Sequence, residues 1–168
     1  MRPVPNRILS HISDNKSLLI EAHVSDFRLI KYRGKQLRAK DFNRLHAQSI
    51  DFLKTSIPES KAKHKNVVSH HVPSQMVNPT MYKDADINPA FVSEQKDLIL
   101  ELQPDYWIYG HHHANMPETA IGKTKLVTNQ LGYVQITSTD TMPVLNWSKT
   151  CISPTLWRNS HQIKEKNF

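Results

Sequence analysis

Residues 105–115 read DYWIYGHHHAN, and the interpretation of the whole chain starts from this stretch. Its first half is an aromatic and β-branched run typical of a buried strand, and a glycine ends that run. Three consecutive histidines, residues 111–113, follow the glycine, and imidazoles at a strand tip are typical metal ligands. If the chain stays extended after Gly110, side chains alternate in direction, so His111 and His113 would point to one side and His112 to the other, which favours His111 and His113 as the ligand pair.

A second stretch, residues 66–74 (NVVSHHVPS), has the same order of an apolar run, imidazoles and a proline that stops the strand. Open α/β sheets place their sites at the carboxyl ends of strands, which is where His70 and His71 would lie. Chance enrichment in a chain with ten histidines is the alternative explanation. Two coincident histidine groups at predicted strand tips favour a metal site.

Three motifs together resemble the C-terminal half of a calcineurin-like metallophosphoesterase: SHHVPS at 69–74, WIYGHHH at 107–113 and TNQLGY at 128–133. The resemblance extends over residues 10–134. It implies an α/β fold, the C-terminal half of a layered α/β/β/α sandwich. On this basis residues 1–137 form the C-terminal portion of the phosphoesterase domain, and residues 138–168 form a strand or tail extension of the same domain.

The resemblance also implies roles for individual residues of this sequence. His70 and His111 would bind one metal ion, and His113 would bind a second. Residues implied to contact substrate or to support the ligands are His71, His112, Asn115 and Asn129. The metals would be manganese, iron or zinc, two in the intact family, and they would activate water for hydrolysis of a phosphoester substrate.

The chain lacks three motifs that this family carries N-terminal to these histidines, namely Asp-x-His, Gly-Asp and Gly-Asn-His. Its four glycines, residues 34, 110, 122 and 132, are never followed by aspartate or asparagine. No catalytic residue is therefore identified, and at most one metal ion is expected. We expect a truncated or split hydrolase, inactive alone, with a complementary N-terminal half as its partner. The alternative is a non-catalytic histidine-cluster protein that binds a metal or phosphate.

Composition sets broader limits on the function. The 168 residues are 38% hydrophobic and 22% charged, as in an ordinary globular domain. The net charge of +7 suits an anionic substrate and does not exclude nucleic acid. No apolar run approaches the roughly 18 residues of a membrane span, so no membrane partner is expected. A single cysteine, Cys151, fits the reducing cytoplasm, which is the expected location.

Local patterns predict the elements around the histidines. Strands are expected at 18–24 and 28–32, with a hairpin turn at Gly34. Residues 41–58 are expected to form a helix capped by Asp41, and a shorter helix capped by Ser93 should end before Pro104. Further predictions are a loop over the strand tips at 73–89 and a strand pair at 124–128 and 132–137, with a turn at Gly122 ahead of it.

Overall fold

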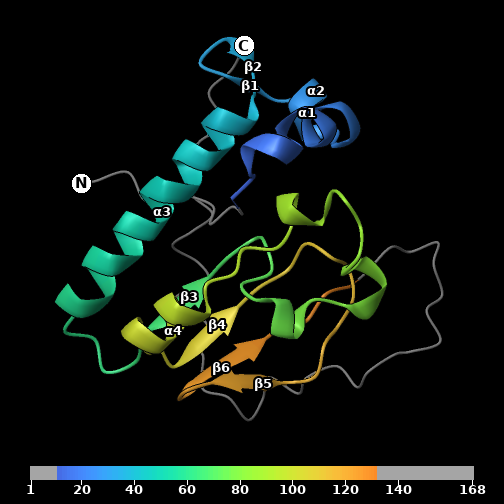
Figure 1. Ribbon diagram of the computed structural model, residues 1–168. Helices are drawn as coiled ribbons and strands as arrows, with labels where there is room; N and C mark the ends of the chain where they lie inside the picture. The colour runs from blue at the N-terminus through green and yellow to red at the C-terminus, as the bar shows by residue number, and fades with distance from the viewer. Residues whose placement is uncertain (1–10, 132–168) are drawn as a thin grey trace. The chain divides into compact units, whose positions relative to one another are not determined.

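The computed structural model describes residues 11–131, which form an α/β arrangement of helices and a mixed sheet (Figure 1). All described residues belong to the first of the two units into which the chain divides, residues 1–137. The α/β class is thus confirmed. The expected strand at 132–137 and the extension at 138–168 lie outside the described residues.

The central sheet has the strand order β3-β4-β6-β5. Strands β3, β4 and β6 are parallel, and β5 runs antiparallel to β6. Their bounds are β3 Asn66–Val68, β4 Tyr106–Ile108, β5 Thr119–Ile121 and β6 Thr124–Val127. Gly122, with φ of 59°, forms the turn between β5 and β6, which confirms its predicted role.

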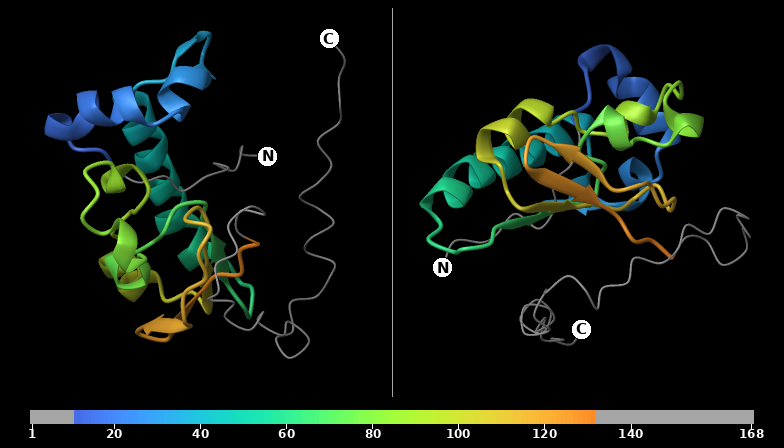
Figure 2. Two further views of the ribbon diagram at one scale, coloured as in Figure 1. Left: turned by 90° about the vertical axis from the view of Figure 1, so that its right-hand side faces the viewer. Right: turned by 90° about the horizontal axis from the view of Figure 1, so that it is seen from below.

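One face of the sheet carries the core. Val67, Trp107 and Leu126 lie side by side in the strand register, and all three are buried. Helices α3 (Ala39–Glu59) and α4 (Lys96–Leu102) supply the residues that pack against them, among them Leu53 and Ile99 (Figures 1 and 2). The burial of Trp107 confirms that the stretch before the histidines is an interior strand.

The N-terminal residues form helices where strands were predicted. Helix α1 spans Asp14–His23 and α2 spans Asp26–Leu29, so the strand at 18–24 and most of the strand at 28–32 are wrong. Ile20 and Val24, four residues apart, are buried, whereas Leu18 between the helix start and Ile20 is 81% exposed. That spacing places one helical face on the core, and apolar content alone did not reveal it.

The hairpin that follows has the predicted turn. Strands β1 (Lys31–Tyr32) and β2 (Lys35–Gln36) are antiparallel and joined by Arg33 and Gly34. Both turn residues have positive φ, 52° and 76°, as a two-residue hairpin of type I′ requires. A second buried cluster joins this N-terminal part to the start of α3 through residues such as Phe27 and Phe42.

The N-terminal caps of the long helix α3 and the short helix α4 both differ from the prediction. Helix α3 begins at Ala39, because a Glu21 carboxylate oxygen of α1 accepts a hydrogen bond from the Ala39 amide, at 2.8 Å, and Asp41 lies inside the first turn. Helix α4 begins at Lys96 after Gln95, so Ser93 is not its cap. In both helices a glutamate carboxylate accepts the hydrogen bond of a first-turn amide. Glu21 accepts from Ala39 in α3, and Glu94 accepts from Lys96 in α4, in place of the predicted caps Asp41 and Ser93.

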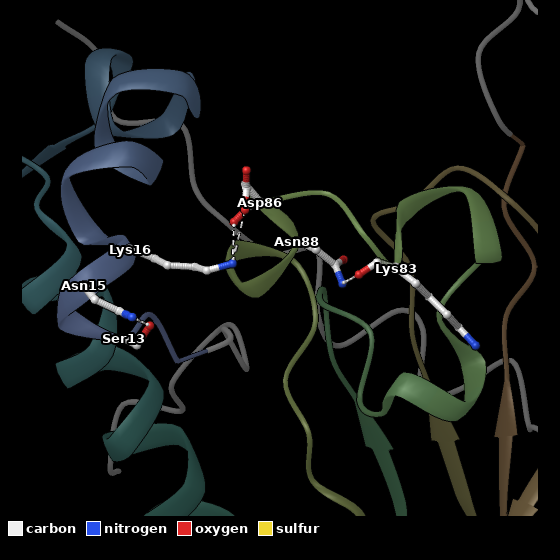
Figure 3. A network of polar contacts seen from close by, with 6 residues as sticks. All are labelled: Ser13, Asn15, Lys16, Lys83, Asp86 and Asn88. Carbon is white, nitrogen blue, oxygen red and sulfur yellow. Dashed lines mark hydrogen bonds and ion pairs between the residues drawn. The ribbon is translucent and has the colours of Figure 1, made fainter.

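The segment between β3 and α4 is a loop, as predicted, and it contains three short 3₁₀ turns. These are η1 (Gln75–Val77), η2 (Thr80–Tyr82) and η3 (Asn88–Ala90). A Lys16–Asp86 ion pair, 3.5 Å between Nζ and Oδ1, links the loop to α1 (Figure 3). The same close-up shows Asn88 donating to the Lys83 carbonyl across 3.5 Å. The first contact joins the residues before η3 to α1, and the second joins η3 to the residue that follows η2.

Candidate metal centre

The two histidine groups meet because their strands are neighbours. Strands β3 and β4 are parallel, and Val68 lies beside Ile108 in their register. The ladder continues past both strand ends: the Ser69 amide donates to the Ile108 carbonyl, and the Gly110 amide donates to the His70 carbonyl, at 2.9 and 3.3 Å. The residues after each strand therefore lie at the same edge of the sheet, as the sequence predicted.

Three imidazoles form a compact cluster there. One ring nitrogen of each of His70, His71 and His111 lies within 4.8 Å of the others, a spacing that could hold a metal ion. His111 Nδ1 and His70 Nε2 are 3.0 Å apart, and the rings of His71 and His111 are centred 4.9 Å apart. The predicted pair of His70 and His111 is brought together, and the cluster adds His71, which the resemblance implied only as a supporting residue.

The chain after Gly110 is not extended, so the predicted alternation of side chains is wrong. His111 and His113 have φ of 79° and 54°, in the left-handed region. The His112 amide donates to the Gly110 carbonyl at 3.2 Å, which closes a three-residue γ-turn around His111. The turn directs His111 toward His70, and His113 is not a member of the three-histidine cluster.

His71 is fixed by a buried chain of hydrogen bonds that starts in the sheet. The Trp107 indole nitrogen donates to the Ser69 hydroxyl oxygen at 2.9 Å, and that hydroxyl donates to the His71 carbonyl at 2.7 Å. His71 is only 4% exposed, and the ring of Phe42 packs against its imidazole with centroids 5.7 Å apart. The sequence placed His71 beside His70 and the resemblance implied a supporting role for it, but neither signal identified it as a ligand.

The surroundings of His111 keep its imidazole uncharged, the form in which a histidine binds a metal ion. Burial, together with the charges of His70, His112 and His113, lowers its pKa to about 4. The ring of Phe91 stacks on the His111 ring with centroids 4.6 Å apart and an interplanar angle of 27°. A neutral imidazole keeps a lone pair for a metal ion at neutral pH, and the aromatic contact restricts the ring's orientation.

His112 is not a member of the three-histidine cluster but lies against it, with its ring edge-on to the His111 ring at 5.5 Å between centroids. It is 8% exposed, and Tyr82 of η2 stacks on it with ring centroids 4.8 Å apart. Neither ring nitrogen has a hydrogen-bond partner within residues 11–131. Burial, and to a lesser extent the charge of His113, lowers its pKa to about 4. His112 is therefore an uncharged residue beneath the loop that crosses the strand tips.

The implied supporting residues Asn115 and Asn129 lie on the segments that flank the histidine loop. Asn115 hydrogen-bonds to the backbone of Gln130 through both ends of its side-chain amide, at 3.0 and 2.7 Å. Gln130 in turn accepts a hydrogen bond from the His113 amide at 2.9 Å. The loop-holding contact that the sequence suggested for Asn129 is thus made by its neighbour.

No carboxylate belongs to the histidine cluster among the residues that the structure describes. Asp86, one of the acidic residues near the strand tips in sequence, pairs with Lys16 and is 80% exposed at its side chain. Asp26 lies in the first turn of α2. The donor set is three imidazoles, which suits zinc and other divalent transition metals and lacks the anionic oxygen that bridges two ions.

Comparisons with known proteins give two distant relatives. The chain is 27% identical over 142 residues to uncharacterized protein L509 of Acanthamoeba polyphaga mimivirus, covering 77% of this chain and 49% of that protein. It is 30% identical over 137 residues to protein disulfide-isomerase 1 of Dictyostelium discoideum, covering 72% of this chain and 36% of that protein. The chain thus spans less than half the length of either relative.

No family model matches the sequence, and no solved structure shows a significant match. Among the described residues, no helix is both long and apolar enough to cross a membrane.

Proposed function

We propose that the chain binds a divalent transition metal ion through His70, His71 and His111, as the histidine part of a metal-dependent phosphoesterase centre. The observation that carries the proposal is the meeting of the three ring nitrogens within 4.8 Å at the carboxyl ends of β3 and β4. The motif resemblance supplies the reaction class. It also supplies the layered sandwich, which we propose as the architecture of the whole enzyme.

The spacing of the cluster fits an ion of this kind. Nitrogens bound tetrahedrally at about 2.0–2.1 Å from zinc lie roughly 3.4 Å from each other. Here one pair is 3.0 Å apart, and no pair among the three exceeds 4.8 Å. Small rotations of exposed His70 would bring the set to that spacing, while buried His71 stays in place. The His111 ring can bind a metal ion at neutral pH without first losing a proton, because its pKa is about 4.

A bound cation would polarise a phosphoryl oxygen and lower the pKa of a water molecule in this centre. The chain's own residues hold, orient and partly bury the ligands. The bridging carboxylate and the acid for the leaving group are absent from the cluster, and we propose that another polypeptide segment supplies them. Such a segment is the complementary partner that the missing motifs suggest.

Metal binding without turnover is the second candidate, because all three cluster ligands are imidazoles. The name of the Dictyostelium relative suggests thiol chemistry, but a catalytic dithiol/disulfide couple needs two cysteines, and this sequence holds Cys151 alone. We therefore do not propose isomerase activity for this chain.

Calorimetric titration with zinc tests the proposal. We expect one ion per chain and an affinity at least about 10-fold lower in His70→Ala, His71→Ala and His111→Ala, since each loses a ligand. His23→Ala, an exposed histidine on α1, is the matched control and should bind as the wild type does. Equal affinity in all variants would reject the site. Hydrolysis of bis-p-nitrophenyl phosphate, assayed with and without a separately expressed segment that carries the missing motifs, then separates the two candidates: the phosphoesterase centre predicts turnover only with that segment, and metal binding without turnover predicts none in either case.

A further inference from the structure

The histidine loop has a backbone that its own sequence does not favour. His111 and His113 are non-glycine residues with φ of 79° and 54°. Each such conformation typically costs on the order of 1–3 kcal/mol and persists only where surrounding structure holds it. The γ-turn closed by the His112 amide and the Gly110 carbonyl, 3.2 Å apart, adds a strained step directly at the ligand His111. External contacts must maintain this shape.

Two side-chain amides make those contacts. The Gln130 amide accepts from the His113 backbone N–H at 2.9 Å and donates to the Ala114 carbonyl at 2.8 Å. The Asn115 amide donates to the Gln130 carbonyl at 3.0 Å and accepts from the Gln130 backbone N–H at 2.7 Å. We call Asn115 and Gln130 the amide clamp. It fastens the loop to the segment that leaves β6.

Hydrogen bonds hold the backbone on both sides of His111 along the chain. The amide clamp bonds to the residues after it, and the segment that follows β3 bonds to the residue before it. Two residues after His111, the His113 amide is held by Gln130. One residue before it, the Gly110 amide is held by the His70 carbonyl at 3.3 Å. A Cβ built on Gly110 would lie 3.8 Å from Gln130 Oε1 and 3.8 Å from the His70 oxygen, so both holding groups converge there.

We propose that Gln130, with Asn115, is a positioning residue that keeps the His111 ring in ligating geometry with His70 and His71. This inference rests on the proposed metal-binding function. Gln130 bears no metal-binding group in the cluster; it acts through the backbone of the loop. Without the clamp the left-handed residues relax, and His111 samples orientations that leave the cluster.

Cobalt titration of Gln130→Ala against a matched glutamine variant tests the proposal. The control is Gln103→Ala: the Gln103 side chain also bonds two backbone groups, the Lys123 amide at 2.9 Å and the Ile99 carbonyl at 3.3 Å. Gln103 follows α4 and precedes β4, so it lies at the end of the strand away from the histidines. Each variant loses two hydrogen bonds between a glutamine side chain and the backbone, but only Gln130→Ala loses bonds to the histidine loop.

We expect Gln130→Ala to weaken cobalt binding by about 10- to 100-fold, the usual effect of losing support behind a ligand, while Gln103→Ala binds as the wild type does. The visible absorption of bound cobalt should shift in Gln130→Ala, because the coordination changes as His111 moves. Gln130→Glu keeps an acceptor for the His113 amide and should recover part of the affinity. Thermal unfolding of each metal-free variant confirms that it is folded.

A readout without metal completes the test. Hydrogen exchange at the His113 amide in the metal-free protein should accelerate in Gln130→Ala and stay slow in Gln103→Ala. If wild-type protein binds cobalt and the two variants bind it equally with unchanged spectra, the positioning role is wrong and the metal site stands. If the wild type binds no cobalt, the proposed function fails, and the inference fails with it.

Discussion

Replacing His112 with phenylalanine should make the metal-free protein more resistant to acid. Burial lowers the pKa of His112 from 6.5 to about 4, so between these values the unfolded chain takes up a proton that the folded chain refuses. The stability linked to this residue is complete above pH 6.5 and is lost as the pH falls toward 4. Phenylalanine cannot titrate, and its ring can keep the stack on Tyr82.

The size of the effect follows from the two pKa values. The linkage relation gives a loss of about 2 kcal/mol at pH 5 and about 3 kcal/mol at pH 4 from His112 alone. His112 also lowers the pKa of His111, so its removal reduces that residue's acid sensitivity in the same direction. The phenylalanine variant additionally buries no unpaired ring nitrogens, which should favour its folded state at every pH.

Urea unfolding followed by circular dichroism, with a chelator present, measures the difference. We expect the free energy of unfolding to fall between pH 7 and pH 5 by about 2 kcal/mol more in the wild type than in His112→Phe. The exposed His23→Phe variant controls for loss of an imidazole as such. An equal fall in wild type and His112→Phe would refute the reasoning.

Three further outcomes are expected. Gly122→Ala should lower the free energy of unfolding by about 1 kcal/mol or more, because φ is 59° and the new Cβ would clash with the side-chain amide of Gln103. Trp107→Phe should destabilise by about 1–3 kcal/mol in urea titration, since a fully buried ring loses volume and its hydrogen bond. In saturating manganese, the chain alone should hydrolyse p-nitrophenyl phosphate no faster than the His70→Ala, His111→Ala double variant; metal-dependent turnover that this variant loses would contradict a requirement for a partner.

The sequence predicted the sheet best where two independent signals agreed. The runs before Gly110 and before His70 are each rich in β-branched or aromatic residues and are each followed by a residue that ends a strand. In the structure they form β4 and β3, which are parallel neighbours. Because the two strands are parallel neighbours, His70 and His111 lie at the same edge of the sheet. Predicting this needed no information beyond the two strands. The α3 helix was also recognisable, because buried Phe42, Ser49 and Leu53 recur at helical spacing.

Failures arose where tertiary contacts decide local structure. The 18–24 run has strong apolar content, but its helix depends on burying Ile20 and Val24 against other elements. The cap of α3 comes from Glu21, a residue 18 positions away from Ala39. Likewise, His111 has a left-handed φ in a loop whose His113 amide bonds to Gln130, a contact that no neighbour in sequence signals.

Anomalous diffraction at the zinc edge, from crystals grown with zinc, tests the central claim most directly. We predict one ion bonded at about 2.0–2.1 Å to ring nitrogens of His70, His71 and His111. Two results would contradict the three-histidine centre. One is zinc bound at full occupancy elsewhere while the cluster holds none, and the other is an ion bound through His113 with His71 unbound.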